Sequence, residues 1–253
     1  MLPTGFFNDP EVLALIAGVF LFAGVVKGTV GLGLPTVSLG ILTATVGLKA
    51  AIALMLIPSL STNIFQALSG PYFRDVMRRL WRFFALVCIG TWAGAEVLVA
   101  ANPDLLAGLL GLVLVFYAVF SLTLFQVPPP GRWEPWLSPP IGLVSGLVTG
   151  LTGSFIVPGS LYLQALGMPR DQLIQALGIS FTIVTVALLA AITSHGLVTA
   201  EIGATSIMAV VPAGLGMIAG AKLRQRISEE RFRRIFFLAL LAMGAYITVR
   251  SFT

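Results

Sequence analysis

Apolar residues fill most of the chain in blocks that glycine-rich or polar stretches separate. Most blocks have about the 20 residues that an α-helix needs to cross the roughly 30 Å hydrocarbon core of a bilayer. The pattern predicts an all-α polytopic membrane protein with about 8 to 10 membrane segments. The apolar segments lie near residues 11–26, 34–46, 50–69, 81–101, 105–126, 138–149, 155–167, 172–194, 202–221 and 232–250.

Two of these segments, 34–46 and 155–167, are too short to cross a bilayer comfortably. Each follows a glycine cluster, GVVKGTVGLGLP at 24–35 or GLVTGLTGSFIVP at 146–158. Glycine-rich backbone at membrane depth is tolerated where it is buried in protein or lines a wet cavity. We therefore expect broken or re-entrant glycine-rich helices, with the short segments as half-helices beside a cavity.

The two glycine clusters also match each other at an offset of about 122 residues, which drifts by about one residue as short insertions would cause. The matched positions are Gly24 with Gly146, Gly28 with Gly150, Gly31 with Gly153, and Pro35 with Pro158. The chain is therefore predicted to contain two repeats, 1–126 and 127–253, within one integral membrane domain.

Basic residues indicate how the two repeats are oriented. One cluster precedes the 81–101 span, whereas another follows the equivalent 202–221 span: Arg74, Arg78, Arg79 and Arg82 in the first half, and Lys222, Arg224, Arg226, Arg231, Arg233 and Arg234 in the second. Because basic residues favour the cytoplasmic side, the equivalent spans are expected to run in opposite directions. Inverted-topology repeats of this kind are typical of secondary transporters. The same rule places both termini outside.

Composition excludes a soluble fold, since 57% of the 253 residues are hydrophobic and only 10% are charged. The mean hydropathy is +0.99. The net charge of +5 comes from residues that flank apolar spans, so no nucleic-acid partner is expected. The start MLPTGFFNDPE lacks the basic residues of a signal peptide, so we expect the first apolar run to remain. The single cysteine, Cys88, excludes a disulfide framework.

A half-helix that starts inside the bilayer points free N–H groups and the positive end of its dipole into a cavity, which favours anions. Two such starts, one per half, are expected to converge on a small anionic substrate. Lys27 supports this prediction, because a charge at the bilayer centre costs about 2.5 to 3.5 kcal/mol and usually has a function. The alternatives are that Lys27 reaches an interface or pairs with a polar neighbour.

Small polar side chains near the breaks complete the predicted site. Ser and Thr hydroxyls can donate to anion oxygens, but they also satisfy backbone carbonyls within membrane helices. Asn63 and Gln66 share one helical face, which points either to a cavity or to a partner helix. The predicted substrate-binding residues are Lys27, Thr29, Gly31, Gly33, Thr36, Ser38, Asn63, Gln66, Gly153, Ser154, Ser180 and Thr182. No metal or cofactor is expected.

Two further ionisable residues have open roles. Glu96 is the one acid well within a span, where it is either a proton carrier or an interfacial residue. His195 falls where a span ends and is expected to be a loop residue. Coupling to a proton or a counter-ion therefore stays open.

The paired glycine-rich segments, each followed by a proline and a short apolar run, resemble those of the TauE/SafE family of membrane permeases, the sulfite exporter family. The resemblance spans nearly the whole chain. It implies a bacterial cytoplasmic membrane protein that exports sulfite, sulfoacetate or related anions. The family pattern often reads G-x-G-G-G before the proline. Both copies here depart from it, with Gly31 and Gly33 in the first and Gly153 and Ser154 in the second.

These features predict an anion transporter that works by alternating access, with the anion bound between the two half-helix starts at mid-membrane. A passive anion channel and a permease for carboxylates are the alternatives, and a homodimer is compatible with either. An enzyme is not expected, because Ser154 precedes phenylalanine instead of the glycine of intramembrane serine proteases, and no H-E-x-x-H motif occurs. No P-loop is present to support ATP-driven transport.

Overall fold

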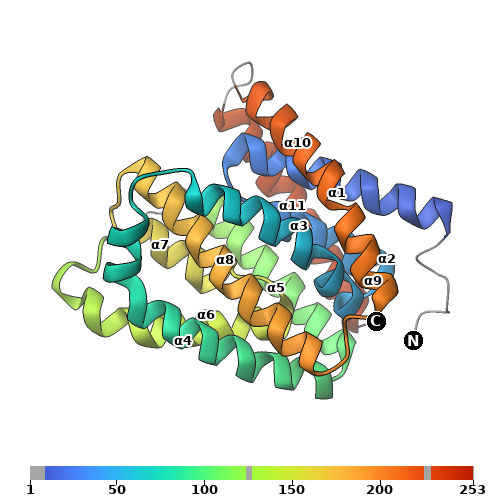
Figure 1. Cartoon of the computed structure of the whole chain (residues 1–253), viewed down its shortest axis with the longest axis horizontal. Helices are drawn as coiled ribbons and strands as arrows, with labels where there is room; N and C mark the ends of the chain where they lie inside the picture. Colours follow the sequence, from blue (N-terminus) through green and yellow to red (C-terminus); the bar gives the residue numbers. More distant parts are fainter. Residues whose placement is uncertain (1–8, 124–126, 225–228, 253) are drawn as a thin grey trace. The chain divides into compact units, whose positions relative to one another are not determined.

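The computed structural model describes residues 9–123, 127–224 and 229–252, and the described residues are helical with short connections (Figure 1). The α-helices are α1 (Pro10–Val30), α2 (Leu34–Val46), α3 (Leu48–Leu68), α4 (Phe73–Ala100), α5 (Pro103–Leu122), α6 (Glu134–Thr152), α7 (Leu161–Ala165), α8 (Arg170–Ser194), α9 (Ala200–Met208), α10 (Val210–Leu223) and α11 (Glu229–Phe252). Two shorter turns, η2 (Gly131–Trp133) and η3 (Ile156–Ser160), precede α6 and α7.

Within the described ranges, 7 helices are long and apolar enough to cross a membrane: α1, α3, α4, α5, α8, the α9–α10 pair and most of α11. The helix α2 is apolar but has only 13 residues. These features confirm the predicted class, an all-α polytopic membrane protein.

The chain divides into two compact units, and each unit takes helices from both halves of the sequence. The first unit contains α1, α2, the start of α3, α5, and α9 to α11. The second unit contains the rest of α3, α4, and α6 to α8. The boundary within α3 follows Ser59, next to the internal proline Pro58.

In the first unit, α1 packs directly against α10 through glycines. A Cβ atom at Gly24 or Gly28 would overlap backbone atoms of α10, and one at Gly216 or Gly220 would overlap backbone atoms of α1. The two helices run parallel, because Gly24 faces Ala213 and the later Gly28 faces the later Met217 and Ala221. Small residues of this kind let helix backbones approach closely in membranes.

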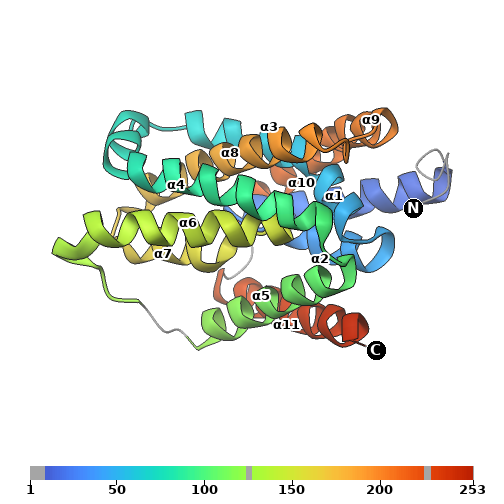
Figure 2. The ribbon, with the colours of Figure 1, turned by 90° about the horizontal axis from the view of Figure 1, so that it is seen from below.

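In the second unit, α4 packs against α6 in the same way (Figure 2). Here the glycines are Gly90 and Gly94 on α4 and Gly146 and Gly150 on α6. Each would carry a Cβ atom into the backbone of the other helix, and these helices also run parallel. At the start of α6, Glu134 accepts two hydrogen bonds from Arg79 of α4, at 2.6 and 2.7 Å. The pair of helices is thus joined along its length by backbone contact and near one end by an ion pair.

The last helices of the two sequence halves, α5 and α11, contact each other within the first unit (Figure 2). A Cβ atom at Gly108 would meet Phe252 and Ser251, whereas one at Gly111 would meet Thr248 and Gly244. The positions rise along α5 as they fall along α11, so these helices are antiparallel.

The second half-helix is less regular than the predicted segment 155–167. Helical structure there is divided into η3 and the five-residue α7, and Val157 is extended, with φ −118° and ψ 128°. A residue that precedes proline is pushed out of the helical region by the proline ring, and Val157 precedes Pro158. The predicted half-helix at 155–167 is therefore divided at Val157 into two short helical pieces, whereas 34–46 forms the regular helix α2.

Candidate functional site

The first break lies between α1 and α2 and is made by glycines. Gly31 ends α1 with φ +86°, and its N–H donates to Lys27 O at 2.7 Å. Gly33, which precedes α2, has φ +111°. Side-chain-bearing residues rarely adopt these angles, so the break depends on glycine. A Cβ atom at Gly31 would meet no atom within 4 Å, which shows open space beside the turn.

Lys27 lies in the last turn of α1, immediately before this break. The residue is only 4% exposed, so a cationic side chain is buried inside the first unit. Its position at a helix C-terminus is favourable for a cation, because the helix dipole is negative there. That favourable contact is worth about 0.3–1 kcal/mol at exposed sites, far below the several kcal/mol that burial of an ion costs. The helix dipole therefore offsets only part of the cost of burying this side chain.

The start of α2 supplies backbone donors. The first N–H groups of a helix have no acceptor within that helix. The first backbone hydrogen bond of α2 runs from Val37 N to the carbonyl oxygen of Gly33, the residue before the helix, at 2.9 Å. Pro35 has no N–H, so Leu34 and Thr36 carry the donors of the first turn, and both residues are buried. Buried donors at the start of a helix form an environment that favours an anion.

The second break repeats the geometry of the first at the matched glycine. Gly153 ends α6 with φ +74°, and its N–H donates to Thr149 O at 2.7 Å. Thr149 is the residue matched with Lys27, so this break has a hydroxyl where the first has a charge. Thr152 shapes the turn, because its Oγ1 accepts a bond from Ser154 N at 3.2 Å. The threonine directly before the glycine was the sequence signal for this contact.

Ser154 has the hydroxyl best suited to a ligand at the second break. The residue is 1% exposed, and its Oγ has no hydrogen-bond partner among the residues that the structure describes. Buried hydroxyls in proteins are normally hydrogen-bonded. The role of Ser154 in substrate binding stays a prediction, and its hydroxyl is available for it.

Four other predicted hydroxyls donate to backbone carbonyls. The bonds are Thr29 to Val25 O, Ser38 to Leu34 O, Ser180 to Ala176 O and Thr182 to Gly178 O, all at 2.7 to 2.8 Å. Thr29 also approaches Gly220 O of α10 at 3.4 Å. An anion would have to compete with these carbonyls for the hydroxyl proton. Their part in binding stays a prediction, and they are weaker candidates than Ser154.

Gln66 contacts a partner helix in the second unit. Its Nε2 donates to Ile174 O of α8 at 2.8 Å. Gln175 of α8 makes the reciprocal contact, donating from Nε2 to Ala67 O and Gly70 O at 2.8 Å each. The sequence left open whether Gln66 faces a cavity or a partner helix, and the structure shows that its amide contacts a partner helix. Asn63 is buried with 1% exposure, and its role in binding stays a prediction.

The comparison with protein families decides the class of this protein. The family model described as Sulfite exporter TauE/SafE matches residues 16–247. The chain belongs to the TauE/SafE sulfite exporter family. No curated protein and no solved structure matches it.

Family membership makes this TauE/SafE protein a multi-pass membrane transporter, in agreement with its seven long apolar helices. The match covers both glycine breaks, from Lys27 to Pro35 and from Thr149 to Pro158. The residues that shape the breaks therefore lie inside the part of the chain that defines the family.

Two ionisable residues of this TauE/SafE protein lie in a contact that the sequence did not predict. Glu96 of α4 and His195, which follows α8, lie 3.1 Å apart, from Oε1 to Nε2. The contact joins the ends of two helices in the second unit. Each residue stood alone in the sequence, nearly 100 positions apart, so only the fold could reveal the pair.

Proposed function

We propose that this protein exports small anions, with sulfite or organosulfonates such as sulfoacetate as substrates, across a bacterial cytoplasmic membrane. The observation that carries the proposal is the burial of Lys27 beside the glycine break and the start of α2. A cation and the N–H groups of a first helical turn can offer charge-assisted hydrogen bonds to an anion, which are roughly twice as strong as neutral ones. The family match supports sulfur oxyanions among small anions.

We further propose that each break provides a helix end that can bind the anion and that transport proceeds by alternating access. Three features support a pair of inverted repeats. The first is the common cap geometry of Gly31 and Gly153, and the second is the pair of parallel helix contacts through glycine, α1 with α10 and α4 with α6, which we call the glycine crossings. The third is the antiparallel contact of α5 with α11. In such repeats the helix that carries each break changes its exposure as the repeat rearranges. Proton or counter-ion exchange would then drive export.

The test is anion binding to purified protein in lipid nanodiscs, with sulfite, sulfoacetate, sulfate, taurine and acetate as probes. We expect sulfite or sulfoacetate to bind most tightly. Lys27→Ala should weaken that binding by about tenfold or more, because a hydrogen bond to a charged group contributes about 1.5–3 kcal/mol. Lys27→Arg should retain part of the affinity.

The matched control is Lys222→Ala, which removes an exposed lysine from α10. It should leave affinity unchanged. Full affinity in Lys27→Ala would remove this residue from the site, whereas a wild-type protein that binds none of the probes would reject the substrate class.

Transport by reconstituted vesicles separates the carrier from a channel. Alternating access predicts saturable efflux that anion on the opposite side accelerates. Large single-channel currents without such acceleration would instead support the passive channel. Preferential transport of acetate over the sulfur anions would support a carboxylate permease.

A further inference from the structure

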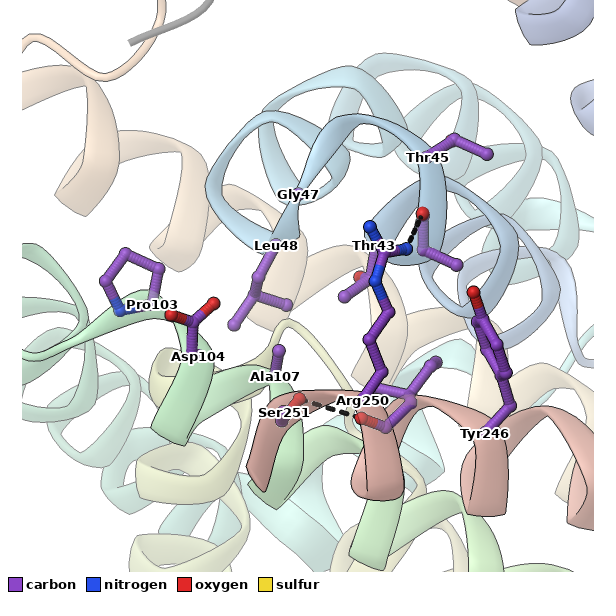
Figure 3. Close-up of a pocket in the computed structure, with 12 residues that line it drawn as sticks. Thr43, Thr45, Gly47, Leu48, Pro103, Asp104, Ala107, Tyr246, Arg250 and Ser251 are labelled. Atoms are coloured by element: carbon purple, nitrogen blue, oxygen red, sulfur yellow. Dashed lines mark hydrogen bonds between the residues drawn. The ribbon is translucent and has the colours of Figure 1, made fainter. Parts of the chain in front are cut away.

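A cavity of about 180 Å³ opens in the first unit, away from the glycine break (Figure 3). It lies where the end of α2, the start of α3, the start of α5 and the last turns of α11 meet. Thr43, on its wall, is about 13 Å along α2 from Leu34, at 1.5 Å per residue. The cavity has room for several water molecules, so it suits a small polar molecule.

Two side chains of opposite charge line this cavity. Arg250 comes from α11 and Asp104 from the first turn of α5. In the view of Figure 3 they stand on either side of Leu48. Within the described ranges they do not form an ion pair: Arg250 Nη1 donates to Ala44 O at 2.5 Å. The lining of the cavity therefore carries one positive and one negative side chain.

Each charge also has a local role in the fold. Arg250 contacts a carbonyl near the C-terminal end of α2, and Asp104 lies at the N-terminal end of α5, so each complements a helix dipole. These roles do not require the space between the charges. They also do not explain Thr43, which lines the cavity, is 8% exposed, and has an Oγ1 that bonds to nothing in the described part of the chain. A buried hydroxyl without a partner points to a ligand or an ordered water.

We propose that this cavity binds a small zwitterion, whose acid group contacts Arg250 and Thr43 and whose ammonium group contacts Asp104. A simple anion would face the carboxylate of Asp104, and a simple cation would face the guanidinium of Arg250. A molecule that carries both charges can pair with both side chains, so it should bind more tightly than a simple anion or a simple cation. The apolar atoms of Leu48 and Ala107 provide a surface for the carbon linker.

Calorimetric titration of the full-length protein in lipid nanodiscs tests the proposal. The probes are glycine, β-alanine and 4-aminobutyrate, which differ in the separation of their charges, with propionate and n-propylamine as halves of the ligand. We expect one amino acid to bind at least tenfold more tightly than either half. Equal binding of propionate would overturn the zwitterion assignment, and so would the absence of amino-acid binding.

Variants locate the binding to this cavity. Asp104→Asn and Thr43→Val should each lower amino-acid affinity, by at least tenfold and by several-fold, respectively. Arg250→Gln should also lower amino-acid affinity, but this variant loses a hydrogen bond to Ala44 of α2. The test therefore depends on Asp104→Asn and Thr43→Val. Arg233→Gln, at the other end of α11, is the matched control and should bind as the wild type does. Unchanged affinity in both Asp104→Asn and Thr43→Val would overturn the proposal.

The zwitterion site does not depend on the proposed anion site. Lys27→Ala should leave amino-acid affinity unchanged while it weakens sulfite binding. Loss of amino-acid binding in Lys27→Ala would show that the probes occupy the glycine break instead, and would overturn the separate site.

Discussion

Two buried serines in the second unit differ in one hydrogen bond. Ser180 donates to Ala176 O at 2.7 Å, whereas Ser154 Oγ has no partner among the described residues. We expect Ser154→Ala to lower sulfite affinity about threefold to tenfold, which corresponds to the roughly 0.5–1.5 kcal/mol of one hydrogen bond. Its melting temperature should stay within about 2 °C of the wild type, since no internal bond is lost.

Ser180→Ala is the control for this serine, because it removes a hydroxyl that is already bonded to its own helix. Its anion affinity should fall less than that of Ser154→Ala. A larger loss of affinity in Ser180→Ala than in Ser154→Ala would contradict the assignment.

Residue types in the sequence predicted where polar groups gather, but not which of them are available. Thr29 and Ser38 lie within regular helix, where the carbonyl four residues earlier accepts their hydroxyls. Ser154 lies just after the turn at Gly153, outside regular helix, so its hydroxyl has no such carbonyl. The difference follows from backbone angles on each side of the break, and these angles depend on the fold.

At the scale of single helices, the glycine contact between α1 and α10 makes a sharp prediction about packing. A Cβ atom at Gly28 would overlap Met217 O, whereas one at Gly18 of the same helix would meet nothing within 4 Å. Gly28→Ala should destabilise the protein by about 1–3 kcal/mol through overpacking. Gly18→Ala should be neutral or stabilising by up to about 1 kcal/mol, because alanine favours helix.

Unfolding of the two glycine variants in mixed micelles, followed by circular dichroism, measures this difference. Equal stability of Gly28→Ala and Gly18→Ala would mean that the close contact of α1 with α10 does not contribute to stability.

Helix positions were predictable because hydrophobicity and length determine a membrane helix. The expected segments 50–69 and 172–194 correspond to α3 and α8. The segment 155–167 is divided because its hydrophobicity is suited to a helix while Pro158 forces the preceding residue out of helical conformation. Pro35 stands in the first turn of α2, where proline is tolerated, so the same residue type had opposite effects in the two halves.

For the whole molecule, the basic clusters predict an orientation that labelling can test. In a Cys88→Ser background, cysteines replace the exposed residues Glu11, Arg78 and Lys222 one at a time. In intact cells a membrane-impermeant maleimide should label only Glu11→Cys, because the positive-inside rule places the other two in the cytoplasm. Permeabilised cells should label all three.

Labelling at positions 78 and 222, taken together, tests the relative orientation of the two repeats. Labelling of one of these positions but not the other in intact cells would show that the halves are not inverted.

The sequence predicted two repeats, but the way each compact unit combines them was not predictable. The helix α1 of the first half packs on α10 of the second, and α6 of the second half packs on α4 of the first. The glycines that allow these contacts are spaced by four residues in each helix, a pattern visible in the sequence. Which glycine helix pairs with which is decided by three-dimensional topology.

The two glycine crossings have a consequence for leakage. Where α1 meets α10 and where α4 meets α6, backbone lies against backbone, with no room even for a methyl group. A file of water molecules needs more space than a methyl group does, so neither crossing can conduct protons or small ions. Each crossing is therefore closed in this structure, and a solute that passes through the protein has to travel along other surfaces.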